Sequence, residues 1–240
     1  MISPRMPKCL NLESKPSNFC PGCGYGLVLK SLGEIIDTEG FGPRTVFALD
    51  IGCNLLAWDY YRLDTVQTHH GRVTPLISGY KRANKNSISL GIAGDGGLYA
   101  IGLQSFLHTA HRDEPVTIIG INNTLYAMTG GQAAPTTLPG EDTDTTPGGK
   151  FTFEKPIFGP ELAKEVAHKD AFLARASVLN IQQMKQLFKQ AIDCQLKGHF
   201  SYVEVLSYCP TNWKTTAEQS IDRVKVLEQT YKVGVINGAN

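Results

Sequence analysis

The sequence has no long apolar run and no block of basic residues. Its 240 residues include 23 Lys and Arg against 22 Asp and Glu, which gives a formal net charge of +1. A chain this close to neutral offers no electrostatic surface for nucleic acid or for an anionic membrane. No segment has the apolar core of a signal peptide or the length that crosses a bilayer. We therefore expect a soluble, cytoplasmic protein that binds neither nucleic acid nor membrane.

Internal repeats are also lacking, and 42% of the residues are hydrophobic, which favours one domain over residues 1–240. Apolar segments alternate between strand-like and helix-like patterns, which predicts an α/β fold with a central, mostly parallel sheet flanked by helices. Residues 129–160, rich in glycine, proline and threonine, read as a long active-site loop. Residues 216–240 read as a polar tail without a core face, and we expect this tail to dock on a partner subunit.

Polar residues end two consecutive predicted strands. Asp95, between Gly94 and Gly96, follows residues 87–93, and Asn123 follows residues 116–121, with a predicted helix at 98–112 between the strands. Parallel strands end at one edge of a sheet, so the carboxylate and the amide converge there. These oxygens suit Mg²⁺, and the glycines let the backbone approach a diphosphate. The spacing resembles the diphosphate-binding motif of thiamine diphosphate enzymes, whereas Gly-Asp-Gly alone most often marks a β-turn.

Cysteines form a second group. Cys20 and Cys23 form a Cys-x-x-Cys turn, whereas Cys53 and Cys209 each follow a predicted strand. Both strands end at the edge predicted to hold the diphosphate. Four thiolates can hold a [4Fe–4S] cluster or a tetrahedral zinc ion, and buried thiols are the third interpretation of Cys53 and Cys209. Thioredoxin-like chemistry is disfavoured because no strand precedes the Cys-x-x-Cys pair.

Together, these motifs resemble the beta subunit of the 2-oxoacid:ferredoxin oxidoreductases. The similarity runs in family order over residues 18–215. Its segments are Cys20-Pro-Gly-Cys-Gly24, Asp50-Ile-Gly-Cys53, His70-Gly-Arg72, Gly79-Tyr-Lys-Arg-Ala83, Gly94-Asp-Gly96, Asn122-Asn123, Tyr126-Ala-Met-Thr-Gly-Gly-Gln132, Pro135-Thr-Thr137 and Cys209-Pro-Thr-Asn-Trp213. Two positions depart from the family: Gly97 stands where many relatives have a second aspartate, which removes any role of that acid, and Ala127 replaces a common glycine.

The resemblance implies thiamine diphosphate, Mg²⁺ and one [4Fe–4S] cluster. Mg²⁺ would be held by Asp95, Asn123 and the main-chain carbonyl of Leu125. The cluster ligands would be Cys20, Cys23, Cys53 and Cys209. The cofactor-binding residues would be Gly52, Cys53, His70, Gly94, Asp95, Gly96, Gly97, Asn123, Leu125 and Tyr126. The catalytic residues would be His70, Thr129 and Gln132, which without the family read as ordinary loop residues.

The family also implies an activity and partners. The reaction would be oxidative decarboxylation of a 2-oxoacid to acyl-CoA and CO₂, with coenzyme A as co-substrate and electrons passing through the cluster to ferredoxin. We expect the chain to be active only with an alpha subunit that supplies the pyrimidine domain and with gamma and ferredoxin-like delta subunits or domains. No segment here matches the pyrimidine domain or a Cys-x-x-Cys-x-x-Cys-x-x-x-Cys-Pro ferredoxin motif.

The substrate is predicted from the residues after Cys53. Leu55 and Leu56 stand where 2-oxoglutarate-directed relatives tend to place a lysine, which favours a branched or aromatic 2-oxoacid and resembles the 2-oxoisovalerate branch. The alternatives are that both leucines belong to the core and that the substrate is 2-oxoglutarate, pyruvate or an aryl 2-oxoacid. Two other classes also fit the sequence: a cluster-free thiamine diphosphate decarboxylase or carboligase, and a non-catalytic interaction protein held by zinc.

Overall fold

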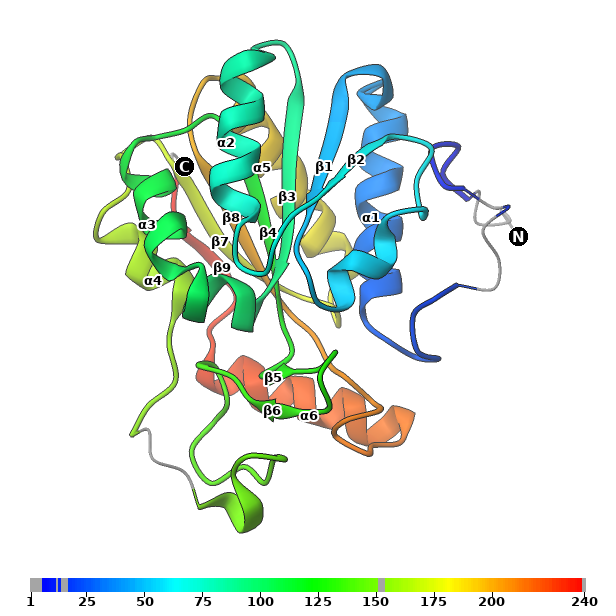
Figure 1. The fold of residues 1–240 in the computed structure, drawn as a ribbon, viewed down its shortest axis with the longest axis vertical. Helices are drawn as coiled ribbons and strands as arrows, with labels where there is room; N and C mark the ends of the chain where they lie inside the picture. Colours follow the sequence, from blue (N-terminus) through cyan, green and yellow to red (C-terminus); the bar gives the residue numbers. More distant parts are fainter. Residues whose placement is uncertain (1–5, 12, 14–16, 151–153, 239–240) are drawn as a thin grey trace.

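A computed structural model describes residues 6–11, 13, 17–150 and 154–238 of the chain. A seven-stranded sheet in the order β2-β1-β3-β4-β8-β7-β9 forms its centre, and β9 alone runs antiparallel, against β7 (Figure 1). The strands are β1 Thr45–Leu49, β2 Asp64–Gln67, β3 Ile88–Gly94, β4 Thr117–Asn122, β7 Phe172–Ser177, β8 Ser201–Leu206 and β9 Gly234–Asn237. A separate two-stranded ribbon pairs β5 Leu125–Tyr126 with β6 Gln132–Ala133. The predicted α/β fold with a mostly parallel sheet is confirmed.

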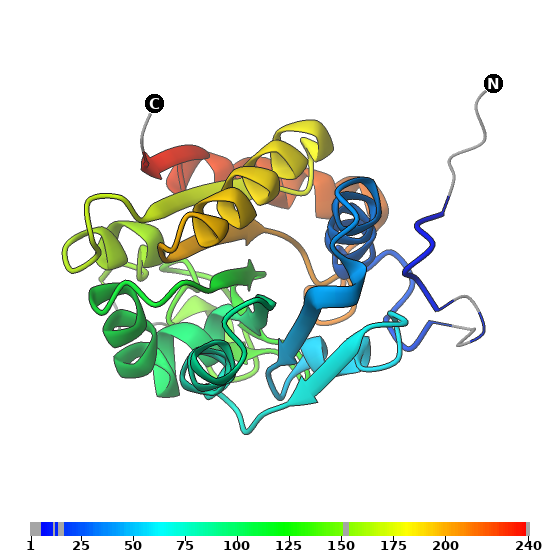
Figure 2. The same ribbon diagram turned by 90° about the horizontal axis from the view of Figure 1, so that it is seen from above.

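Helices cover both faces of this sheet. They are α1 Tyr25–Thr38, α2 Val73–Ala83, α3 Leu103–His111, α4 Gly159–Lys164, α5 Ile181–Leu196 and α6 Ala217–Thr230. Short helical turns add η1 Gly42–Arg44, η2 Cys53–Ala57, the π-helical η3 Gly97–Ile101 and η4 Pro147–Gly149. α1 and α5 lie on one face, and α2, α3 and α4 lie on the other (Figure 2).

The two faces of the sheet bury two separate apolar cores. Along β1, Phe47 and Leu49 face the core under α1 and α5, whereas Val46 and Ala48 face the core under α2 and α3. Both sets are almost fully buried. A strand buried on both faces reads as a continuous apolar run, which is why the central strands were predictable from the sequence.

The predicted lack of a core face in the tail is wrong. Thr216 caps α6 with a capping box that includes Gln219. The helix buries Val224 and Leu227, and Tyr231 behind it is fully buried. β9 then adds an edge strand to the central sheet. Residues 217–237 therefore belong to this domain, and α6 lies across the carboxyl end of the sheet together with β5 and β6 (Figure 1). Docking on a partner stays a prediction.

The predicted loop at 129–160 is largely irregular, with β6 and η4 inside it and α4 beginning at Gly159. Residues 151–153 of this loop lie outside the described residues, as do 239–240 of the tail. Among the described helices, none is both long enough and apolar enough to cross a membrane.

Candidate active site

A cavity of about 300 Å³ opens at the carboxyl ends of β1, β3 and β4. Its lining residues are Tyr25, Asp50, Ile51, Gly52, Cys53, Asn54, His70, Gly94, Asp95, Gly96, Gly97, Asn123, Leu125, Tyr126, Ala127, Met128 and Thr129. All ten predicted cofactor-binding residues are among them. The register of the sheet explains why Asp95 and Asn123 lie together. Gly94 of β3 pairs with Ile121 of β4, and the turns that carry Asp95 and Asn123 follow directly after these residues. Asp95, Asn123 and Leu125, the predicted Mg²⁺ ligands, thus line one cavity.

Asp95 is a buried carboxylate with few partners. Only 2% of its surface is exposed, and the Thr136 hydroxyl donates a hydrogen bond to its Oδ2. Burial raises the pKa of Asp95 to about 7, and the hydrogen bonds from Thr136 and the Gly96 backbone offset only part of this rise. The charged form is therefore costly until a cation binds beside it. Thr136 comes from the 129–160 loop, and its position is fixed by Tyr231, whose hydroxyl donates to the Thr136 carbonyl at 2.7 Å.

Asn122 and Asn123 point in different directions and have different partners. Asn123 Oδ1 accepts the Leu125 backbone N–H at 3.1 Å and stays on the cavity wall. Asn122 points into the protein, where its Nδ2 donates to Glu204 Oε1 at 3.1 Å. Glu204 and its ion-pair partner Arg175 have fully buried side chains. Through Asn122, this buried ion pair therefore holds the turn that presents Asn123. Removing one partner of such a pair leaves an uncompensated buried charge, which strongly destabilises the fold.

Two glycines of the motif leave room for neighbouring side chains. A Cβ on Gly96 would lie 2.3 Å from the Tyr126 ring, and one on Gly97 would lie 2.0 Å from Asp50 Oδ2. Gly97 thus creates the space that the Asp50 carboxylate fills. The expectation that an acidic role is simply missing at position 97 is therefore incomplete, because Asp50 brings a carboxylate to the same place from the end of β1.

Asp50 is a site residue that the sequence reasoning missed. Its side chain is fully buried, and Oδ1 accepts the Gly71 backbone N–H at 2.7 Å. Oδ2 has no hydrogen-bond partner among the described residues and lies 3.4 Å from His70 Nδ1. Burial raises the pKa of Asp50 to about 6, against the opposing effect of His70. His70 Nδ1 lies 2.7 Å from the Ile51 carbonyl, and the ring lines the cavity.

The two remaining predicted catalytic residues, Thr129 and Gln132, differ in their position relative to the cavity. Thr129 is exposed and lines the cavity, whereas Gln132 does not. Gln132 instead contacts Thr129 twice: its Oε1 accepts from the Thr129 hydroxyl at 2.5 Å, and its Nε2 donates to the Thr129 carbonyl at 2.8 Å. In this conformation, Gln132 orders the loop beside the cavity. Leu55 and Leu56 also do not line the cavity, because η2 presents Cys53 and Asn54 to it.

Cys20, Cys23, Cys53 and Cys209 gather beside this cavity, and Cys53 belongs to its wall. The pKa of Cys53 is raised to about 12. Burial is the main cause, and the charges of the neighbouring Cys23, Cys209 and Cys20 thiolates add to it. Burial is also the main cause of the raised pKa of Cys23, about 11, with smaller contributions from Cys209 and Cys20. Thiols that raise one another's pKa become thiolates when a metal binds. The structure thus brings the four predicted cluster ligands to one place.

The segment after Cys209 connects the cysteines to the polar turn. Trp213 Nε1 donates to the Asn123 carbonyl at 3.1 Å, and Asn212 Nδ2 donates to the Ala127 carbonyl at 2.6 Å. The Arg223 guanidinium lies 3.3 Å from the centre of the Trp213 ring. These contacts fix the distance between the thiols and the cavity wall.

The donor set fits the cofactors that the sequence implies. The pKa of Asp95 is raised until a cation binds beside it, and Gly94 lines the cavity without a side chain. The Cys20, Cys23 and Cys209 thiols are close enough to Cys53 to raise its pKa. Asp95 and Asn123 with the Leu125 carbonyl would hold Mg²⁺, and the four cysteines would hold an iron–sulfur cluster.

Comparisons with known proteins identify a matching family and related proteins. Residues 50–205 match the family described as thiamine pyrophosphate enzyme, C-terminal TPP binding domain. Ketoisovalerate oxidoreductase subunit VorA of Methanothermobacter marburgensis is 38% identical over 208 residues, which are 84% of this chain and 43% of that protein. The chain thus spans less than half the length of this relative.

Other relatives match over more of their length. 2-Oxoglutarate synthase subunit KorB of Archaeoglobus fulgidus is 33% identical over 223 residues, which are 93% of this chain and 80% of that protein. The solved structure of 2-oxoglutarate:ferredoxin oxidoreductase from Magnetococcus marinus superposes with a TM-score of 0.79 over 99% of this chain and 86% of that one. At 20% identity, this last similarity supports the fold alone.

Proposed function

The chain belongs to the thiamine diphosphate-binding subunits of the 2-oxoacid:ferredoxin oxidoreductase family, and we propose that it oxidatively decarboxylates a 2-oxoacid to an acyl-CoA. One observation carries the proposal: Asp95, Asn123 and Leu125 line the same cavity as Cys53, which belongs to a group of four cysteines. Thiamine diphosphate, held at Asp95, Asn123 and Leu125, would supply carbanion chemistry for decarboxylation, and a cluster on the four cysteines would supply a site for electrons.

The residues of the chain bind and position these groups. Asp95, Asn123 and the Leu125 carbonyl would ligate Mg²⁺ and so neutralise the diphosphate. His70 lines the cavity, and its Nδ1 lies 2.7 Å from the Ile51 carbonyl, so its other ring nitrogen would be the one that serves the bound groups. We assign it the role of hydrogen-bond partner to the reacting groups, with Asp50 behind it as a positioning residue. Thr129 would contact the substrate, and Gln132 would position Thr129.

An iron–sulfur cluster is favoured over a single zinc ion by the spacing of the sulfurs. Two thiolates on one zinc lie at most about 4.6 Å apart, twice the Zn–S bond of about 2.3 Å. Among the described residues, no three of these cysteines have sulfurs that all lie within 4.8 Å of one another. A wider, polynuclear group such as [4Fe–4S] matches this arrangement better. A cluster-free decarboxylase would give the four neighbouring thiols no ligand to bind.

We propose a branched-chain 2-oxoacid, of the 2-oxoisovalerate type, as substrate. The support now comes from the cavity rather than from Leu55 and Leu56. Its described wall contains no Lys or Arg, and Ile51, Leu125, Ala127 and Met128 make it apolar. The second carboxylate of 2-oxoglutarate would stay unpaired there, which is costly. 2-Oxoglutarate is the second candidate, because the chain matches KorB proteins over 92–93% of its own length in several organisms.

The proposal includes partner subunits. Ile51 and Met128 are 45% and 46% exposed although both line the cavity. Apolar side chains at an open cavity mouth suit a protein that covers it. An alpha subunit would supply the pyrimidine-binding wall here, and gamma and ferredoxin-like delta subunits or domains would serve coenzyme A and onward electron transfer to ferredoxin.

The test is turnover by the assembled complex on four 2-oxoacids, followed by acceptor reduction with coenzyme A and Mg²⁺–thiamine diphosphate present. We expect kcat/KM for 2-oxoisovalerate to exceed that for 2-oxoglutarate by roughly 100-fold, with phenylpyruvate and pyruvate between them. A preference for 2-oxoglutarate would reject the substrate assignment. Turnover on none of the four would reject the reaction class, and turnover by this chain alone would reject the role of the alpha subunit.

A further inference from the structure

Three side chains with metal-binding atoms meet at the edge of the sheet opposite the cavity. Asp113 lies in the turn between α3 and β4, His168 in the turn between α4 and β7, and His199 in the turn between α5 and β8. These three strands are neighbours in parallel register, so the turns that precede them converge at their amino ends. None of the three residues lines the cavity, and the proposed reaction does not use them.

Their ligand atoms face one another closely. One ligand atom from each residue lies within 4.8 Å of the other two. Asp113 Oδ2 is 2.7 Å from His199 Nδ1 and 3.6 Å from His168 Nδ1. The two imidazole rings stack with their planes 4° apart and their centres 5.7 Å apart. Both Nδ1 atoms thus lie within 3.6 Å of the same carboxylate oxygen.

Asp113 is held in this position by its backbone. Its φ of 51° is uncommon for a residue other than glycine. Its N–H donates to the Ala110 carbonyl at 3.1 Å, and its Oδ1 accepts the Phe200 N–H at 2.8 Å. With Oδ1 occupied, Oδ2 is the oxygen that faces the histidines. The carboxylate is thus preorganised by contacts that do not involve either imidazole.

The group has more acceptors than donors. The Asp170 N–H donates to His168 Nδ1 at 3.4 Å, which gives this nitrogen the role of an acceptor. The same nitrogen lies 3.4 Å from Asp170 Oδ2 and 3.6 Å from Asp113 Oδ2. Lone pairs that converge in this way are satisfied by a cation between them. The direct hydrogen bond of 2.7 Å between His199 Nδ1 and Asp113 Oδ2 is the competing arrangement, and it leaves His168 Nδ1 outside it.

We propose that Asp113, His168 and His199 bind one divalent transition-metal ion of the zinc type. Two imidazoles and a carboxylate are the donors that such ions select. Bonds of about 2.0–2.2 Å place tetrahedral or octahedral ligands about 2.9–3.6 Å apart, close to the contacts seen here. The His168 side chain is 46% exposed, so water or Asp170 can complete the shell. The ion would tie together three turns that enter neighbouring strands.

The test is titration of the full-length chain with Co²⁺ under anaerobic conditions, followed by visible absorption. Nitrogen and oxygen ligands give d–d bands without the sulfur-to-metal charge-transfer bands that the cysteine group would add, so the two sites are distinguished in one spectrum. With Mg²⁺ and thiamine diphosphate present in excess to occupy the Asp95 site, we expect one further thiolate-free Co²⁺ site per chain. His168→Gln and His199→Gln should each weaken it by at least about 100-fold, more than the roughly 10–100-fold lost with an outer-shell partner.

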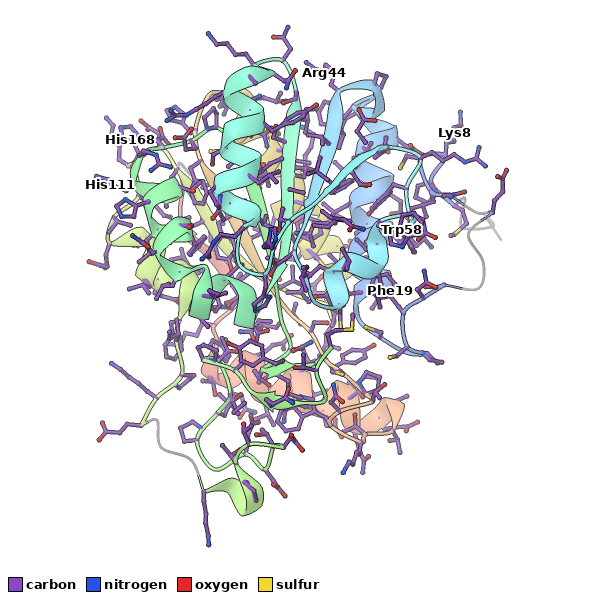
Figure 3. The ribbon with its side chains drawn as sticks, in the orientation of Figure 1. Lys8, Phe19, Arg44, Trp58, His111 and His168 are labelled. Atoms are coloured by element: carbon purple, nitrogen blue, oxygen red, sulfur yellow. The ribbon has the colours of Figure 1, made fainter. Side chains whose placement is uncertain are left out.

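His111→Gln is the matched control. His111 is exposed on α3, and its Nδ1 lies 3.3 Å from the Val166 carbonyl, on the same side of the molecule as His168 (Figure 3). It is outside the three-residue group. This variant should bind Co²⁺ like the parent chain. Absence of a thiolate-free band, or equal binding by His168→Gln and His111→Gln at unchanged circular dichroism, would overturn the proposal. Zn²⁺ should displace Co²⁺ from the site.

Discussion

Replacing Asp95 with asparagine is expected to raise the stability of the cofactor-free chain and to abolish cofactor binding. Burial raises the pKa of Asp95 from 3.8 to about 7. Because the folded-state pKa lies above the unfolded one, the folded chain keeps a proton between about pH 4 and pH 7 that the unfolded chain has released. The free energy of unfolding therefore falls as the pH rises through this window.

The size of the effect follows from the same shift. A rise of about three units in this pKa lowers the free energy of unfolding by about 4 kcal/mol above pH 7. An asparagine removes this charge and can still accept the hydrogen bond from Thr136, but its new amide N–H group lacks a partner, which costs about 1–3 kcal/mol. The expected net gain for Asp95→Asn is about 2 kcal/mol at pH 8. At pH 4 the parent carboxyl is protonated, so only the cost of the unpaired amide remains, and the variant should be less stable than the parent by about 2 kcal/mol.

Urea denaturation between pH 4 and pH 8, with EDTA and without thiamine diphosphate, measures this difference. With Mg²⁺ and thiamine diphosphate at 100 times Kd, the parent chain should gain about 2.7 kcal/mol and the variant nothing. Asp64→Asn, at an exposed position of β2, should change neither result. The reasoning fails if Asp95→Asn is destabilising at pH 8 without cofactor, or if the variant still responds to Mg²⁺ and thiamine diphosphate.

Three further substitutions test the supports of the site. Gly97→Ala places a Cβ 2.0 Å from Asp50 Oδ2 and should weaken thiamine diphosphate binding by roughly 100-fold in calorimetry, whereas Gly79→Ala, with no neighbour within 4 Å, should not. Glu204→Ala leaves the buried Arg175 short of a partner and should cost about 3–5 kcal/mol in urea denaturation; a loss below 1 kcal/mol would contradict this. Thr136→Val should raise the pKa of Asp95 further and move the midpoint of Mg²⁺ binding to higher pH, while Thr136→Ser should keep it.

The sequence predicted the features that depend on local pattern. Asp95 and Asn123 each follow a buried apolar strand at once, so strand order alone brings them to one edge. Cys53 and Cys209 were placed near that edge by the same rule. The pattern of α5 Ile181–Leu196 is local in the same way, because its apolar residues repeat at the helical period.

Other features depend on tertiary contacts that leave little trace in the sequence. Asp50 reads as the last residue of a strand, and only the glycine at position 97 and the turn at Gly71 make it part of the site. α6 buries mainly Val224 and Leu227, a stripe too narrow to stand out in a polar segment. β2 and β9 are short, partly exposed edge strands, so they lack the continuous apolar pattern of the central ones.

Metal and cofactor analysis of the complex purified under anaerobic conditions tests the central proposal most directly. We predict one thiamine diphosphate and one Mg²⁺ per copy of this chain. Cys53→Ser should remove about four irons per copy relative to the parent complex, and Asp95→Asn should remove thiamine diphosphate. Zinc in place of iron at the cysteines, or a complex that retains thiamine diphosphate when Asp95 is replaced, would contradict it.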